Sequence, residues 1–237
     1  MIAWTAEKPL AAFAAVDAWV FDLDNTLYAA DCGVFPQIHA RMAQFIRETL
    51  NLDADAADAL RARYWRDHGT TLNGLMREQG LAPELFLDFV HDIDLSAIPP
   101  SPALAAAISG LPGRKLVHTN GSRDHAARVL AQLGLEGRFD GVYAIEDSDF
   151  TPKPERAAFE QIAEQAGIDP GRSAMFEDSP RNLHAPKEMG MVTILVRAPA
   201  GADAALTREP DGAEDPKVDF VTEDLTDFVT QVARSIS

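Results

Sequence analysis

The distribution of apolar and polar residues divides the chain into segments of two kinds. In the first kind, a short apolar run is followed at once by polar or turn-forming residues, which is the pattern of a buried strand that gives way to a loop. Such runs lie at about residues 18–22, within 139–145, and at 115–118, 173–176, 192–196 and 218–221. Because helical segments separate these runs, the pattern predicts an α/β fold with a parallel sheet and helices on both faces.

The helical segments are recognised by apolar residues at intervals of three and four. In the second half of the chain they are expected at 124–133, 155–166, 180–189 and 225–234. Gly134, Gly167 and Gly190 follow the first three, and glycine is the usual residue directly after a helix.

A second group of helices lies between residues 33 and 98, where the pattern contains no strand. These helices are expected at 34–50, 53–68, 70–79 and 83–92, with Asp53 as an N-cap. The sequence therefore predicts a core domain of residues 1–32 and 99–237, interrupted by a helical cap domain of residues 33–98. An insertion at the mouth of a parallel sheet is positioned to act as a lid.

Two segments have no clear pattern. Residues 8–17 fit either a short helix or an irregular arm. Residues 199–217 are rich in small and acidic residues and are expected to form a solvated loop. The segment 98–102 contains three prolines and is expected to end the helical insertion.

Composition and charge narrow the functional classes. The chain of 237 residues has a formal net charge of −16, and an acidic surface repels phosphate backbones, so nucleic-acid binding is not expected. No window reads as a transmembrane helix or a secretory signal. The single cysteine, Cys32, excludes an internal disulfide and a multi-cysteine metal site. These properties predict a cytoplasmic protein without a membrane partner, and leave open whether it is a monomer or a homodimer.

The candidate chemistry lies directly after the predicted strands. In open α/β sheets, ligands bind outside the carboxyl ends of the strands, so residues at these positions converge although they are far apart in sequence. The residues found there are Asp22 and Asp24, then Thr119, Asn120 and Gly121, then Lys153, and finally Glu177 and Asp178.

Asp22 and Asp24 start on the same side of the first strand because side chains alternate along a strand. Two like charges this close raise each other's energy unless a cation lies between them or one of them stays protonated. Taken alone, the pair is equally consistent with a strand end that forms an Asx-turn and caps a helix.

The other strand ends supply what a phosphate-transfer reaction needs. One carboxylate can attack phosphorus and form an aspartyl-phosphate, and a second can protonate the leaving oxygen and later deprotonate water. Magnesium takes oxygen ligands, usually one or two carboxylates with phosphate and water. The Thr119 hydroxyl and the backbone N–H groups of Asn120 and Gly121 can hold phosphate oxygens, and Lys153 supplies a positive charge.

These four motifs resemble those of the haloacid dehalogenase (HAD) superfamily. The segment Asp22-Leu23-Asp24-Asn25-Thr26-Leu27 is similar to its first motif, Asp-x-Asp-x-Thr/Val, and Thr119 is similar to the second. Lys153 between two prolines is similar to the third, and the segment 177–182 to the fourth. The resemblance implies a Rossmann-like core with an inserted helical cap, with Asp22 as the nucleophile and Asp24 as the general acid and base.

The same resemblance implies Mg²⁺ as the cofactor, held by Asp22, the backbone carbonyl of Asp24, and Asp178. Asn182 stands where many relatives carry another Asp, so we expect it to hydrogen-bond behind the metal ligands. Whether Glu177 reaches the metal is open from the sequence. The dehalogenases of the superfamily lack the second Asp because a halide leaves without a proton, whereas an alkoxide needs one. Asp24 therefore favours a phosphomonoester hydrolase over a dehalogenase.

The cap and its surroundings are similar to the pyrimidine 5′-nucleotidase branch of the superfamily, in the segments 64–75, 89–92 and 118–126 and at Tyr28. This likeness implies hydrolysis of a nucleoside 5′-monophosphate, such as UMP or CMP, to nucleoside and phosphate. Thr70, Thr71 and His91 are candidates for substrate contact, with structural roles as the alternative. His125 fits packing or substrate contact, and His39 is expected to be structural.

Three alternatives remain from the sequence. The first is a phosphatase for another small metabolite, such as a sugar phosphate or phosphoglycolate, which would share the core and differ in the cap. The second is a haloacid dehalogenase. The third is a non-catalytic binding protein that keeps the fold, against which the intact set of Asp22, Asp24, Thr119, Lys153 and Asp178 counts.

Overall fold

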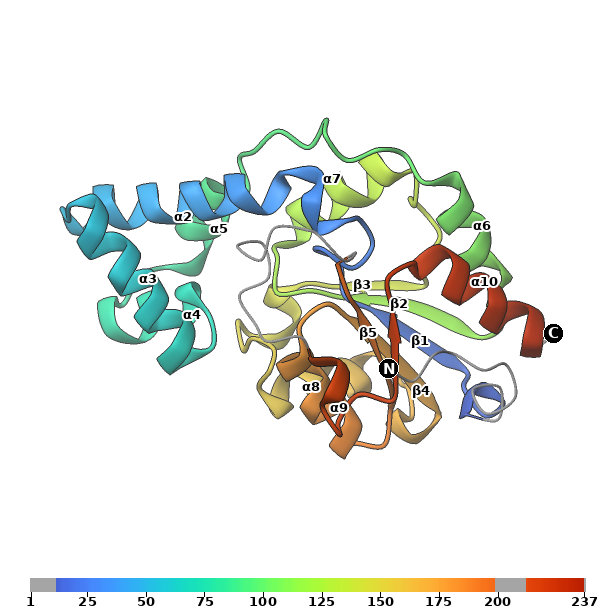
Figure 1. Ribbon diagram of the computed structural model, residues 1–237. Coiled ribbons are helices and arrows are strands. Elements are labelled where there is room, and N and C mark those ends of the chain that lie inside the picture. The colour runs from blue at the N-terminus through green and yellow to red at the C-terminus, as the bar shows by residue number, and fades with distance from the viewer. Residues whose placement is uncertain (1–11, 199–211, 237) are drawn as a thin grey trace.

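The centre of the fold is a six-stranded parallel sheet with the strand order β3-β2-β1-β4-β5-β6. The computed structural model describes residues 12–198 and 212–236 (Figure 1). The strands are β1 (Ala18–Phe21), β2 (Arg114–His118), β3 (Gly141–Tyr143), β4 (Ser173–Glu177), β5 (Val192–Val196) and β6 (Phe220–Thr222). The structure confirms the expected α/β class and parallel sheet.

The first strand lies in the middle of the sheet. Phe21 of β1 is in register with Val117 of β2 on one side and with Phe176 of β4 on the other. The strand order changes direction between β1 and β4, so the loops that follow these two strands diverge and leave a crevice. Ligands of open α/β sheets bind at this point.

Helices cover both faces of the sheet, as expected. The helices α6 (Pro102–Gly110), α7 (Arg123–Leu133) and α10 (Leu225–Ile236) lie on one face, and α8 (Arg156–Ala166) and α9 (His184–Glu188) on the other (Figure 1). Alternate residues of β1 serve the two faces, because Trp19 and Phe21 belong to the first apolar cluster and Val20 to the second.

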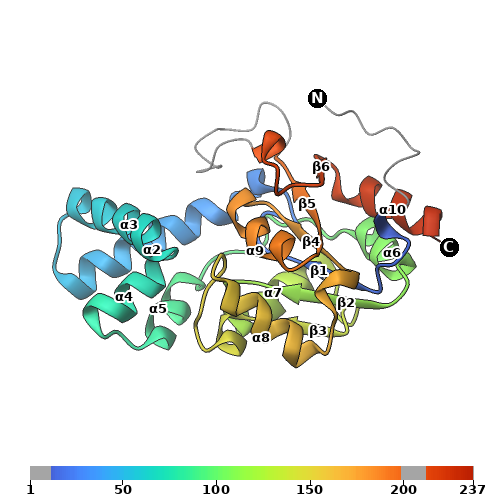
Figure 2. The same ribbon diagram turned by 90° about the horizontal axis from the view of Figure 1, so that it is seen from below.

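Four helices form the cap, a separate lobe beside the carboxyl edge of the sheet (Figure 2). They are α2 (Val34–Leu50), α3 (Ala54–His68), α4 (Thr71–Gln79) and α5 (Pro83–Val90). The lobe has an apolar core of its own, which includes Phe45, Tyr64 and Phe86. The expected N-cap of α3 is confirmed, because the Asp53 side chain accepts a hydrogen bond from the Ala56 N–H at 2.8 Å. The exact limits of the cap, residues 33 and 98, stay a prediction.

The prediction from the sequence differs from the structure at two helices. The sequence pattern did not predict α6, although Pro102 at the start of this helix loses no hydrogen bond there. The expected helix 180–189 is instead a 3₁₀ turn, Pro180–Leu183, followed by the short α9. Pro186 inside this segment has no backbone N–H to continue a regular helix.

Several element ends also differ from the expectation. The last strand covers 220–222 rather than 218–221, and α5 ends at Val90 rather than at residue 92. Residues 1–11 and 199–211, which include part of the expected arm and most of the expected loop, lie outside the described residues. None of the helices in the described part of the chain is long and apolar enough to cross a membrane.

A substitution at Gly74 in α4 can test the packing of the cap. A Cβ atom at Gly74 would overlap the ring of the buried Tyr64. We expect Gly74→Ala to lower the free energy of unfolding by about 1–3 kcal/mol, because the ring must shift within a packed core. Urea titration measures this change. Gly110→Ala is the control, since its Cβ would meet the Cβ of Ala233 at an ordinary 3.6 Å. Equal stability of the two variants would contradict the packing.

Candidate active site

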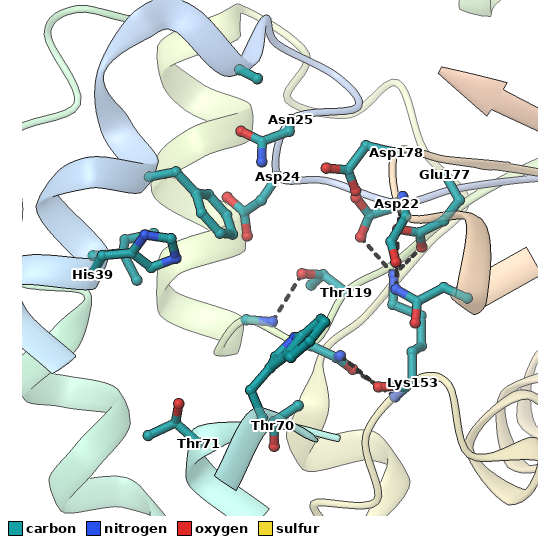
Figure 3. A pocket seen from close by; sticks show the side chains of 18 of the residues that line it. Asp22, Asp24, Asn25, His39, Thr70, Thr71, Thr119, Lys153, Glu177 and Asp178 are labelled. Carbon is teal, nitrogen blue, oxygen red and sulfur yellow. Dashed lines mark hydrogen bonds and ion pairs between the residues drawn. The ribbon is translucent and has the colours of Figure 1, made fainter. Parts of the chain in front are cut away.

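Asp22 follows β1 and both of its carboxylate oxygens are held. Lys153 Nζ donates to Oδ1 at 2.6 Å, and the Thr26 hydroxyl donates to Oδ2 at 2.9 Å. The backbone N–H of Asp22 continues the sheet by donating to Phe176 O of β4 at 2.9 Å. The carboxylate is therefore fixed at the crevice between β1 and β4 (Figure 3).

Lys153 is buried, and its ammonium group uses all three of its hydrogens. Nζ donates to Asp22, to Glu177 Oε2 at 2.7 Å and to the carbonyl of His118 at 3.0 Å. Burial lowers the pKa of Lys153, but the two carboxylates outweigh this effect and hold the pKa above its usual value. The side chain of Asn120 fixes the Lys153 backbone, accepting from its N–H at 2.8 Å and donating to its carbonyl at 3.0 Å.

Three carboxylates gather beside this lysine. Asp22, Glu177 and Asp178 each offer an oxygen atom, and these atoms all lie within 4.8 Å of one another. Burial, followed by the charge of Glu177, raises the pKa of Asp22 to about 7. Burial and the charges of Glu177 and Asp22 raise the pKa of Asp178 well above its usual value.

The electrostatics of this cluster favour a divalent cation. If all three carboxylates were ionised, two negative charges would lack a counter-charge within the cluster, and this repulsion is part of why the pKa values of Asp22 and Asp178 are raised. A donor set made of carboxylate oxygens alone suits Mg²⁺. The residues present therefore fit the expected metal, with Glu177 as a further possible ligand beside Asp22 and Asp178.

Asn182 lies directly behind this cluster. Its side-chain N–H donates to Glu177 Oε1 at 3.2 Å, and the backbone N–H of Ser179 donates to the same oxygen at 3.3 Å. Glu177 is thus held from both of its oxygens, by Lys153 on one and by the loop after β4 on the other. Asn182 thus hydrogen-bonds one of the candidate ligands, and its expected role behind the metal ligands stays a prediction.

Asp24 is held separately, by two side chains to which the sequence reasoning assigned no such role. Its Oδ1 accepts from the Tyr28 hydroxyl at 2.6 Å and from His125 Nε2 at 2.8 Å. Burial raises the pKa of Asp24, but His125 and Tyr28 outweigh this effect and lower the pKa to about 2. Burial and the Asp24 charge raise the pKa of Tyr28 far above its usual value, so the hydroxyl stays a donor.

His91 and His125 form a stacked pair. Their ring centroids are 4.2 Å apart with an interplanar angle of 12°. His91 Nδ1 lies 3.0 Å from the Ser122 hydroxyl, and burial lowers the pKa of His91 to about 3, so the ring is neutral at pH 7. His91 comes from the end of the cap and His125 from α7, so the pair joins the cap to the core.

The second motif forms a tight turn next to Asp24. The backbone N–H of Gly121 donates to Thr119 Oγ1 at 2.9 Å, although the sequence suggested this N–H as a phosphate ligand. A Cβ at Gly121 would lie 3.1 Å from the His125 ring, so a larger residue would disturb it. The expected binding of phosphate by Thr119, Asn120 and Gly121 stays a prediction.

A cavity of about 540 Å³ joins these groups to the cap (Figure 3). The catalytic candidates line one end of it. Its cap end is largely apolar, with Thr70, Thr71, His39, His91 and the indole N–H of Trp65 as the cap groups that can hydrogen-bond. The apolar cap residues that line it are Phe35, Ile38, Met42, Trp65, Leu72, Phe86, Leu87 and Val90.

His39, which the sequence predicts to be structural, lines the cavity, and its role stays a prediction. A signal was available in the helical pattern. Phe35, Ile38 and Met42 recur at the spacing of one helix face, and His39 is four residues after Phe35 on that face.

The loop after β4 also contacts the cap. The Arg181 guanidinium lies over the Trp65 ring at 4.7 Å from its centroid, and Arg181 Nη2 donates to Gly69 O at 3.2 Å. A cation above an aromatic face and a charged hydrogen bond both stabilise contact between the two lobes.

Comparison with known proteins places these motifs in a family. A family model described as haloacid dehalogenase-like hydrolase matches residues 16–190, which is more than half of the chain. Phosphate metabolism protein 8 of Saccharomyces cerevisiae is 28% identical over 191 residues, covering 74% of this chain and 60% of that protein. The chain thus spans less than two thirds of the length of this relative.

Solved structures share the fold at low sequence identity. The L-2-haloacid dehalogenase of Xanthobacter autotrophicus is 19% identical with a TM-score of 0.59, covering 94% of this chain and 100% of that one. A HAD phosphatase of Thermococcus onnurineus is 18% identical with a TM-score of 0.58, covering 90% and 96%. The magnesium-bound HAD hydrolase YfnB of Bacillus subtilis is 17% identical with a TM-score of 0.57, covering 92% and 98%.

The buried lysine tests the electrostatics of the site. We expect Lys153→Met to lower the free energy of unfolding by about 3 kcal/mol, because Asp22 and Glu177 lose their shared counter-charge. Lys217→Met is the matched control, since Lys217 forms an exposed ion pair with Glu188, and its loss should cost at most about 1 kcal/mol. Thermal and urea unfolding measure both. A Lys153→Met variant as stable as the control would contradict the buried pairing.

Proposed function

The chain belongs to the haloacid dehalogenase-like hydrolase family, and within it we propose that this protein is a Mg²⁺-dependent phosphomonoester hydrolase. The observation that carries the proposal is Asp24, a second carboxylate on the same loop as Asp22, lining the same cavity and held by two hydrogen bonds. A leaving alkoxide needs a proton and a leaving halide does not, so this residue supports a phosphatase rather than a dehalogenase.

The proposed reaction has two steps. An oxygen of Asp22 attacks phosphorus, the ester P–O bond breaks, and Asp24 gives a proton to the leaving alkoxide; because Asp24 is ionised in the free site, it must take up this proton when the phosphate ester binds. Asp24, now a carboxylate, takes a proton from water as the water attacks the aspartyl-phosphate. The bond between phosphorus and Asp22 breaks, and inorganic phosphate and free Asp22 are released.

In this reaction, Lys153 and the acidic cluster would act on the charge of the phosphoryl group and of the nucleophile. The Lys153 charge faces Asp22 at 2.6 Å and can stabilise the charge that develops on the transferred phosphoryl group. When bound by Asp22 and Asp178, with Glu177 as a third oxygen donor, Mg²⁺ would offset the negative charge of phosphate and nucleophile. Magnesium in the related fold of YfnB supports this assignment.

The cap end of the cavity supports a nucleoside 5′-monophosphate as substrate. Its walls combine Trp65 and Phe35 with the hydroxyls of Thr70 and Thr71. A flat base can pack against such walls and still find a few hydrogen-bond partners, which is the usual composition of a small-molecule site. A sugar phosphate exposes many hydroxyl groups, and the apolar cap lining offers them few partners. We therefore propose UMP or CMP first, and a sugar phosphate or phosphoglycolate second.

A substrate panel tests the activity. With Mg²⁺, the protein should release phosphate from UMP and CMP with a higher kcat/KM than from sugar phosphates or phosphoglycolate. Asp22→Asn should lose at least about 10³-fold in kcat, because the nucleophile is gone. Asp58→Asn, at an exposed position in α3, is the matched control and should keep full activity. No turnover of any phosphate ester would exclude the proposal and favour a non-catalytic binding protein.

Metal binding is testable without turnover. We expect isothermal titration calorimetry to detect one Mg²⁺ per chain, with an affinity at least about tenfold lower in Asp178→Asn, because a carboxylate ligand is replaced by a neutral amide. Asp58→Asn should bind Mg²⁺ as the wild type does. Excess chelator should abolish phosphate release, and added Mg²⁺ should restore it. Unchanged affinity in Asp178→Asn would contradict the assigned metal site.

A further inference from the structure

The two hydrogen bonds to Asp24 reach the same oxygen atom. The Tyr28 hydroxyl donates to Oδ1 at 2.6 Å, and His125 Nε2 lies 2.8 Å from the same oxygen and donates to it in the tautomer that carries the ring proton on Nε2. A carboxylate oxygen has two lone pairs in the carboxyl plane, so these donors occupy the positions where Oδ1 would take a proton. The proton that Asp24 transfers must then sit on Oδ2.

Oδ2 faces the turn of Thr119 and Gly121, where we expect phosphate to bind. It lies 3.5 Å from where a Cβ of Gly121 would be, next to the turn of Thr119. Asp24 lines the cavity, so the carboxyl is accessible to substrate there although most of the residue is buried. The oxygen without a donor from Tyr28 or His125 is therefore on the side where the leaving group and the attacking water are expected.

Both donors are held rigidly by their surroundings. The ring of Tyr28 belongs to the apolar cluster of the core, in which it is almost fully buried. His125 is fully buried on the first turn of α7, where the Ser122 side chain caps the helix, and its ring stacks on His91. Among residues 12–198 and 212–236, the ring of His125 makes one hydrogen bond, to Asp24, and its Nδ1 has no hydrogen-bond partner.

From this geometry we propose that Tyr28 and His125 are positioning residues for the acid–base step. They fix the Asp24 carboxyl so that Oδ2 alone gives the proton to the leaving alkoxide and later takes one from water. The inference rests on the proposed phosphomonoesterase activity and extends it to two side chains that do not touch the substrate phosphorus.

A purely structural role predicts a different outcome from a positioning role. If the two donors only satisfied a buried carboxylate, their loss would weaken the fold and lower activity equally on all esters. If they orient the proton donor, removing them should lower activity by an amount that depends on how much the leaving group needs a proton. Benzyl phosphate leaves as a strongly basic alkoxide, and p-nitrophenyl phosphate leaves as a stabilised phenolate that needs little protonation. The two probes therefore separate the roles.

The experiment compares kcat/KM for these two probes in the full chain with Mg²⁺, since kcat/KM reports the steps up to release of the first product. In Tyr28→Phe and His125→Phe, which keep an aromatic ring, we expect a loss of about tenfold or more on benzyl phosphate and at most about threefold on p-nitrophenyl phosphate. His125→Gln keeps an N–H donor at the position of Nε2 and should recover part of the loss on benzyl phosphate.

Tyr64→Phe is the matched control. The Tyr64 hydroxyl accepts from Gln79 Nε2 at 3.1 Å inside the cap, away from Asp24, so its removal should not change the ratio of the two kcat/KM values. Equal losses on both probes in Tyr28→Phe and His125→Phe would overturn the inference and leave the phosphatase proposal standing. A wild-type protein that cleaves neither probe nor any ester of the panel would overturn both. If His125→Phe does not fold, Tyr28→Phe, which keeps the buried ring, decides the question alone.

Discussion

The site depends on one buried ammonium group. Lys153 Nζ joins Asp22 after β1 to Glu177 at the end of β4, and also holds the His118 carbonyl at the end of β2. Three strand ends are thus tied to one charge at the crevice where the strand order reverses. Burying an ion pair is costly and is weak evidence for stability. Its position beside three carboxylates is better explained by the chemistry that we propose for this site.

The charge balance of the cluster, the position of Asp24 and the cap can each be described relative to this interaction. The carboxylates exceed the single ammonium charge, which leaves room for a divalent cation. Asp24 has hydrogen-bond partners of its own, so the two aspartates that start on the same strand face differ in their surroundings and in their proposed roles. The cap adds a largely apolar wall above both, and Arg181 and the His91–His125 pair connect that wall to the core.

The fold could be predicted from the sequence where local pattern and tertiary context agree. Buried strands before Asp22 and Glu177 give clear apolar runs, and residues 34–50 of the cap show a clear helical period, whereas 53–68 is helical by composition. The pattern failed at α6, where prolines hid a helix whose first residue tolerates them, and at the segment 180–189, where a 3₁₀ turn precedes the short α9 because Pro186 lacks the N–H that would bond back to residue 182.

The sequence predicted the site residues at the strand ends, but not the side chains that hydrogen-bond to them. Asp22, Lys153 and Asp178 stand in motifs with known spacing, whereas the contact between His125 and Asp24 spans 101 positions and depends on how α7 packs. His39 lay on the predicted apolar face of its helix, but only the folded cap places that face in the cavity.

The proposed function depends most on the transfer of phosphate through Asp22. Its most direct test is acid quench of Asp24→Asn during turnover of p-nitrophenyl phosphate, followed by peptide mass spectrometry. Because the base for the second step is missing, we expect a phosphoryl group on the peptide that contains Asp22. Release of phosphate with no such adduct, or an adduct on another residue, would contradict it.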